Sequence, residues 1–211
     1  LGSRHFWNTA ILAPRFLISA GASGPALLIL IFSVIRSRTP LKVQESVFDY
    51  LKSVLRLTMP INLFLLGCDM FTEFYPGTTH SIAARYLFFG IGSHHMLPKF
   101  IWSAIAMDIT AAVIFIVPKF RDNRRLMFLG CALTMVGIWT EKGMGLVFPG
   151  FTPSPLGEIV EYAPNLPELL VCFGVLALGS LLFTAFAKVA IAIQCGQLRM
   201  DPNAPIHLDD H

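Results

Sequence analysis

Five long apolar stretches dominate the hydrophobic pattern of this chain, and each is long enough to cross a lipid bilayer. A spanning helix needs about 20 mostly apolar residues. Glycine and proline inside these stretches do not argue against helices, because both residues are tolerated in membrane spans. The pattern therefore predicts an all-α fold, a polytopic transmembrane helix bundle with five spans, at about residues 11–36, 53–75, 98–118, 126–148 and 168–195.

The composition agrees with a membrane protein. Of the 211 residues, 55% are hydrophobic and only 14% are charged, whereas soluble domains carry about a quarter charged residues. The basic residues lie in short loops between apolar stretches rather than in one patch, so the sequence gives no support for nucleic-acid binding. We expect residues 1–211 to form a single multi-pass bundle in a cell (inner) membrane.

The distribution of basic residues predicts the orientation of this bundle. One side holds the C-terminus and the connections after the first and third spans, and it carries Arg36, Arg38, Lys42, Lys52, Arg56, Lys119, Arg121, Arg124, Arg125 and Arg199. The opposite side carries Arg4, Arg15, Arg85 and Lys99. By the positive-inside rule, the C-terminus is cytoplasmic. The outer segments 76–97 and 149–168 are too long for simple turns, which suggests a lid or a docking surface.

Three acidic residues fall within the outer halves of two predicted spans. Asp69 and Glu73 lie four residues apart, which places both carboxylates on one face of a helix. Glu141 lies at a depth similar to that of Asp69, roughly 10 Å below the outer boundary, on a span that runs in the same direction. These acids either handle protons or a ligand, or they form an ion-pair network with Lys142, which could also pair with an acid on a neighbouring helix.

Asp108 is the deepest predicted charge, near the middle of the third span. A lone acid there costs about 2.5–3.5 kcal/mol on insertion scales, so it must face protein or water. The residue type and depth fit two roles equally well. Asp108 either carries protons or hydrogen-bonds to a neighbouring helix.

Cysteine and histidine positions argue against a bound metal or haem. The four cysteines are isolated within apolar runs, and no CxxC or Cys/His cluster is present. His80, His94 and His95 belong to the outer loop, whereas haem ligands would lie well inside helices. His94 and His95 are either proton relays at the outer surface or solvated loop residues. Tyr75 fits an interfacial aromatic belt or a quinone headgroup pocket.

Several runs of the sequence resemble one membrane-protein family. The first span, with APRFLISAGASGPALLIL, is similar to a helix of NrfD/PsrC-type membrane subunits. LGCDMFTEFY and the run from EKGMGLVFPGF through LGEIVEYAP to FAKVAI resemble more narrowly the DsrP/HmcC branch. The resemblance covers nearly the whole chain. Family members are usually about twice this length, with eight to ten helices, so the resemblance implies that this chain is a C-terminal half.

The resemblance also implies a function. Such a subunit would exchange electrons and protons between membrane quinone or menaquinone and a ferredoxin-like iron–sulfur subunit docked on the outer face, with other membrane and cytochrome subunits nearby. It would bind no haem or iron–sulfur cluster itself. Quinol oxidation releases protons, so Asp69, Glu73 and Glu141 would form a proton path.

Asp108 would extend this path inward if protons cross the membrane. His94, His95 and Tyr75 would lie near the quinone. Two alternatives stay open, a proton-coupled transporter and a structural anchor for an iron–sulfur partner.

Overall fold

A computed structural model describes residues 5–41, 43–77, 81–92, 94–152, 158–159 and 165–196. The secondary structure of these residues is helical, apart from one isolated bridge between Ile91 and His94. The chain divides into two compact units. The larger unit comprises residues 1–34 and 44–161, and the smaller comprises residues 35–43 and 162–211. The all-α prediction is confirmed for the described residues.

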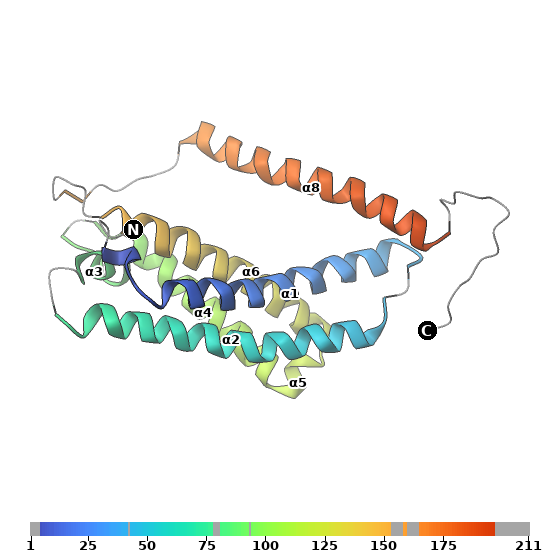
Figure 1. Ribbon diagram of the computed structural model, residues 1–211, viewed down its shortest axis with the longest axis horizontal. Coiled ribbons are helices and arrows are strands. Elements are labelled where there is room, and N and C mark those ends of the chain that lie inside the picture. Colours follow the sequence, from blue (N-terminus) through green and yellow to red (C-terminus); the bar gives the residue numbers. More distant parts are fainter. Residues whose placement is uncertain are drawn as a thin grey trace. The chain divides into compact units, whose positions relative to one another are not determined.

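Four long helices build the larger unit: α1 (Leu12–Arg38), α2 (Glu45–Phe74), α4 (Met96–Ile116) and α6 (Arg124–Lys142). The last turn of α1 belongs to the smaller unit. They run side by side in Figure 1, with α2 and α6 pointing one way and α4 the other. α4 packs most extensively against α6 and also packs against α2. The short helix α5 (Pro118–Arg121) joins α4 to α6.

The faces of α2 show why this unit suits a membrane. Its buried positions recur every three or four residues and include the polar side chains of Asn62 and Asp69. Its exposed positions include Leu57, Phe64 and Phe71, each more than 60% exposed. A soluble helix would place its polar residues on the outside. Here apolar side chains form the exterior and polar ones lie within, as expected for a bundle surrounded by lipid.

The helices correspond closely to the predicted spans. Four described helices are long and apolar enough to cross a membrane, namely α1, α2, α4 and α8 (Leu166–Gln194). The predicted fourth span, 126–148, consists of α6, a five-residue π-helix η3 (Gly143–Val147) and the short α7 (Phe148–Gly150). Charged residues at both ends of α6 shorten its apolar stretch, so the count of five spans stays a prediction.

α2 begins at Glu45, eight residues before the predicted start of its span. The additional turns are amphipathic. Phe48 and Leu51 are buried, while Asp49 accepts a hydrogen bond from Lys52 one turn away, at 3.0 Å. This helix therefore starts in a polar region and continues into the apolar one, a boundary that a search for uncharged residues cannot find.

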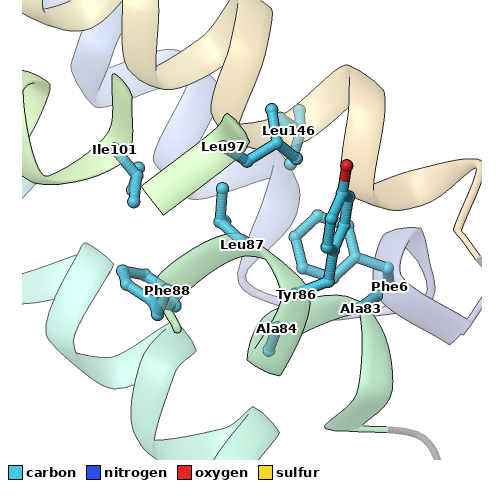
Figure 2. Close-up of a cluster of buried hydrophobic side chains, with 9 residues drawn as sticks. All are labelled: Phe6, Ala83, Ala84, Tyr86, Leu87, Phe88, Leu97, Ile101 and Leu146. Atoms are coloured by element: carbon cyan, nitrogen blue, oxygen red, sulfur yellow. The ribbon is translucent and has the colours of Figure 1, made fainter. Parts of the chain in front are cut away.

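The predicted outer loop at 76–97 contains a short helix, α3 (Ile82–Phe88), that folds back onto the end of the bundle. Figure 2 shows a buried apolar cluster there, to which η1 (His5–Trp7), α3, α4 and η3 contribute. Its members are Phe6, Ala83, Ala84, Tyr86, Leu87, Phe88, Leu97, Ile101 and Leu146. The cluster closes one end of the larger unit, which we call the α3 end.

The segment η1 is fixed at the α3 end by Trp7. Its indole N–H donates a hydrogen bond of 3.0 Å to the carbonyl oxygen of Leu146 in the π-helix. The ring lies directly against Gly150, where an added Cβ would come within 2.0 Å of it. A side chain larger than hydrogen at residue 150 would displace the ring, so this glycine permits the contact that holds Phe6 in the apolar cluster.

The smaller unit contains α8. Its first turn is closed by a capping box, in which the Glu168 carboxylate accepts a hydrogen bond of 2.8 Å from the backbone N–H of Asn165. This arrangement satisfies backbone donors that a helix otherwise leaves without partners. Half of the predicted outer segment 149–168, including most of LGEIVEYAP, lies outside the described residues.

Candidate functional site

A buried arginine joins three helices of the larger unit. Arg15, on the first turn of α1, is only 5% exposed. Its Nη1 donates to the Oδ2 atom of Asp69 on α2, and its Nη2 donates to the Oε1 atom of Glu141 on α6. Lys142 Nζ also contacts Glu141 Oε1, at 3.0 Å. We call these four residues the Arg15 cluster.

The Arg15 cluster is balanced in formal charge, with two basic and two acidic side chains. Balance matters because an unpaired ion inside a bundle is strongly disfavoured. The guanidinium has a forked set of donors that can bind two carboxylates at once. Lys142 also lies 5.6 Å from the centre of the Phe16 ring on α1. The ion-pair network considered as an alternative from the sequence is therefore present, although Lys142 pairs with its own neighbour and Arg15 makes the connections between helices.

Several buried polar atoms of the Arg15 cluster find no hydrogen-bond partner in the described part of the chain. They are Arg15 Nε, Asp69 Oδ1 and Glu141 Oε2. Each carboxylate thus uses one oxygen for an ion pair and keeps the other for a further donor. A buried carboxylate that is only half satisfied is a suitable acceptor for a proton or for water.

A small cavity lies beside the Arg15 cluster at the α3 end. Its volume is about 20 Å³, which is enough for a water molecule. The polar wall consists of Arg15, Asp69, Glu73 and Glu141. Much of the apolar wall belongs to the cluster in Figure 2, namely Phe6, Ala84, Leu87, Phe88 and Ile101. α3, from the predicted lid segment, therefore forms part of the wall that encloses the acids.

The structure brings together three of the acids predicted as site residues. Asp69, Glu73 and Glu141 line the same cavity, and Glu73 interacts electrostatically with Asp69. Glu73 is half-buried, one turn beyond Asp69 on α2. Asp69 and Glu141, which the sequence predicts at matching positions on parallel helices, both contact the same arginine.

Asp108 lies apart from the cavity, on α4. It is fully buried, and an added Cβ at Gly137 of α6 would come within 2.3 Å of its Oδ1 atom. Glu141, one turn further along α6, interacts with it electrostatically. Neither carboxylate oxygen of Asp108 has a hydrogen-bond partner among the described residues.

The residues predicted near a quinone do not line this cavity. Tyr75 is 77% exposed, and its ring stacks on Phe71 with 5.0 Å between ring centres. His95 is exposed and lies against Gly90, whose φ of 79° belongs to the left-handed region. His94 is partly buried and pairs with Ile91 through backbone hydrogen bonds. His80 lies outside the described residues.

Arg15 is the site residue that the sequence interpretation missed. Its place near the start of the first span groups it with the outer basic residues that set the orientation. Charge balance could have identified it, since buried acids require a cation and few basic residues fall within the spans. Asn62, an amide in the middle of α2 that is only 1% exposed, is also missing from the predicted site residues, and a polar side chain within an apolar span is the signal that could have identified it.

Within the described part of the chain, no group of three His, Cys, Asp or Glu side chains is arranged to hold a metal ion. Cys131 is buried in α6, and Cys68 in α2 is partly buried. The absence of a haem or iron–sulfur cluster in this chain stays a prediction.

Comparison with known proteins identifies the family. The model of the family described as "Polysulphide reductase, NrfD" matches residues 1–152, which include the whole Arg15 cluster and Asp108. Neither the search of curated proteins nor that of solved structures found a match. Proteins of this family are membrane subunits of quinone-linked redox complexes, together with iron–sulfur subunits. Since the match covers more than half of the chain, this multi-pass membrane protein belongs to the NrfD family.

Proposed function

We propose that this chain is part of an integral membrane subunit that exchanges electrons and protons between quinone or menaquinone and a docked iron–sulfur subunit. The chain would be the C-terminal half of a DsrP/HmcC-type protein, with five spans and a cytoplasmic C-terminus in the cell (inner) membrane. The iron–sulfur subunit would dock at the outer, α3 end. Other membrane and cytochrome subunits would complete the assembly.

One observation carries the proton-handling part of this proposal. Three carboxylates, from Asp69, Glu73 and Glu141, line one cavity at the end of the bundle that the charge distribution predicts to be outer. Oxidation of a quinol gives up two protons for two electrons, so a quinol site needs acceptors that lead protons to water. Partly satisfied carboxylates beside a water-sized cavity supply such acceptors.

The arrangement of the acids supports an order for the path. Glu73 is half-buried and lies nearest to the end of α2. Asp69 and Glu141 follow, joined through Arg15. Asp108 lies deeper and interacts electrostatically with Glu141. A proton would pass between Asp108, Glu141, Asp69 and Glu73, while Arg15 and Lys142 keep the ionised forms stable.

The Arg15 cluster also favours a second candidate function, a structural anchor for an iron–sulfur partner. A guanidinium that pairs with acids on two other helices holds three helices together. Such a brace needs no proton transfer. The two functions differ in the turnover expected when the acids are replaced by uncharged amides of the same shape.

A quinone analogue tests the first part of the proposal. The purified complex, with its iron–sulfur subunit, would be assayed for quinol-dependent reduction of that subunit. We expect a headgroup analogue to inhibit this electron transfer in a concentration-dependent way. Electron transfer that is unaffected by a saturating analogue, together with no analogue binding, would contradict quinone exchange.

Substitution of the acids tests proton handling. Glu141→Gln and Asp69→Asn keep the shape of the side chain and remove the proton-accepting carboxylate. We expect turnover to fall by about 10²-fold or more if these acids act as bases. Asp49→Asn, at an exposed position on α2, is the matched control. Turnover per assembled complex equal to that of the control, with a lower yield of complex, would support the anchor instead.

A further inference from the structure

Two polar side chains are buried in the interior of the larger unit, away from the cavity. Asp108 on α4 is 0% exposed and Asn62 on α2 is 1% exposed. All four side-chain oxygen and nitrogen atoms of this pair lack a hydrogen-bond partner among the described residues. The Arg15 cluster has ion pairs to offset its burial. This pair has none.

Contacts between neighbouring helices place the two side chains at the same depth. The Thr134 hydroxyl on α6 lies 3.8 Å from the Met59 sulfur on α2. Three residues further along each of these parallel helices come Asn62 on α2 and Gly137 on α6. Gly137 is the residue against which Asp108 lies. Asn62 and Asp108 are therefore on the same layer of the bundle, on facing helices that pack together.

Gly137 provides the space for this arrangement. An added Cβ there would be 2.3 Å from the Oδ1 atom of Asp108 and 3.1 Å from its carboxyl carbon. The carboxyl group therefore occupies the volume that a side chain at residue 137 would take. Any residue other than glycine would push the acid out of this layer or push the helices apart.

The chemistry of the pair suits a carboxyl group that is alternately protonated and ionised. A buried polar group without a partner costs about 1–3 kcal/mol, and a charged one costs more. A carboxyl group needs a donor when ionised and an acceptor for its O–H when protonated. An amide offers both, through Nδ2 and Oδ1. Thr134 cannot serve equally well, because its hydroxyl already donates to the Gly130 carbonyl oxygen at 2.9 Å.

We propose that Asp108 is an exchangeable proton site within the bundle, and that Asn62 hydrogen-bonds to its carboxyl group, directly or through one water, in both protonation states. Two charged groups face Asp108 from α6, Glu141 and Lys142. α2 contributes the uncharged Asn62 to the layer. Asp108 would carry the proton, and Asn62 would be a positioning residue.

This inference deepens the proton path of the proposed function by adding Asn62 and the space beside Gly137. It can be tested without electron transfer. Infrared difference spectroscopy on the lipid-reconstituted complex detects the carbonyl stretch of a protonated carboxylic acid directly. Quinol-dependent electron transfer, measured on the same samples, reports separately on the proposed function.

We expect a carboxylic-acid band that is absent from D108N, shifts in deuterated water and declines as the pH is raised. D108E should keep a band at a different position, and so assigns the signal if D108N assembles poorly. We expect N62L to move the band to higher frequency, because the C=O group loses a hydrogen-bond donor. N62Q, which keeps the amide, should move it less.

Three results would overturn the proposal. The first is an Asp108 band that is missing at every pH. The second is a band that neither deuterium nor pH changes, which would mean a permanently held proton. The third is a band that N62L leaves unaltered, which would remove Asn62 from the site. If the Asp108 band behaves as expected but the complex shows no quinol-dependent electron transfer, the result would count against the proposed function alone.

Discussion

Replacement of Arg15 by methionine should strongly destabilise the larger unit. Methionine keeps much of the length of the side chain and removes the guanidinium. Asp69 then loses the ion pair that the structure gives it, whereas Glu141 keeps Lys142 at 3.0 Å. Breaking a buried ion pair by removing one partner costs about 3–5 kcal/mol, because the remaining charge stays buried. We expect a loss in this range for R15M.

A second substitution shows whether the lost free energy comes from the stranded carboxylate. In the R15M background, Asp69→Asn removes the unpaired charge. The double variant should therefore be more stable than R15M, with a coupling energy within the usual range for contacting residues, about 0.5–3 kcal/mol. A purely additive result would indicate that the two side chains do not interact.

The assay is unfolding of the purified protein in mixed micelles, followed by circular dichroism as the denaturing detergent is increased. Arg56→Met is the matched control, because Arg56 is an exposed arginine on α2. If R15M unfolds at the same detergent fraction as this control, the buried cluster does not hold the helices together. The structural basis of the anchor function would then be wrong.

Three further substitutions test the packing around the site. Gly137→Ala should destabilise the bundle by about 1–3 kcal/mol in the same assay, because its Cβ would overlap the Asp108 carboxyl group, and unchanged stability would contradict the close contact. Trp7→Phe should lower the free energy of unfolding by about 0.5–1.5 kcal/mol, because the hydrogen bond to the Leu146 carbonyl oxygen is lost. It should also raise the rate of hydrogen exchange in η3, and unchanged exchange would show that Trp7 does not hold this helix in place. Gly150→Ala should increase Trp7 fluorescence quenching by water, because the ring can no longer rest on the helix, and an unchanged spectrum would refute this.

The amino-acid sequence alone was enough to predict the long helices and the matching positions of Asp69 and Glu141 along two of them. Membrane spans are recognised from local composition, because about 20 apolar residues are needed to cross lipid wherever they occur. Helical periodicity is also local, so the common face of Asp69 and Glu73 follows from their spacing. Matching depths on parallel spans then brought Glu141 to the same layer as Asp69. The structure has helices at these positions, and it brings Asp69 and Glu141 to the same arginine.

Only the tertiary structure decided which side chains meet. Arg15 lies 54 residues from Asp69 and 126 from Glu141, and no local pattern connects positions so far apart. Contact depends on how each helix is rotated and how deeply it sits beside its neighbours, which the packing of the whole unit determines. For the same reason the sequence could mark Asp108 as buried but could not place it against Gly137. The depth of a residue depends on its own helix, whereas its side-chain contacts depend on how several helices pack together.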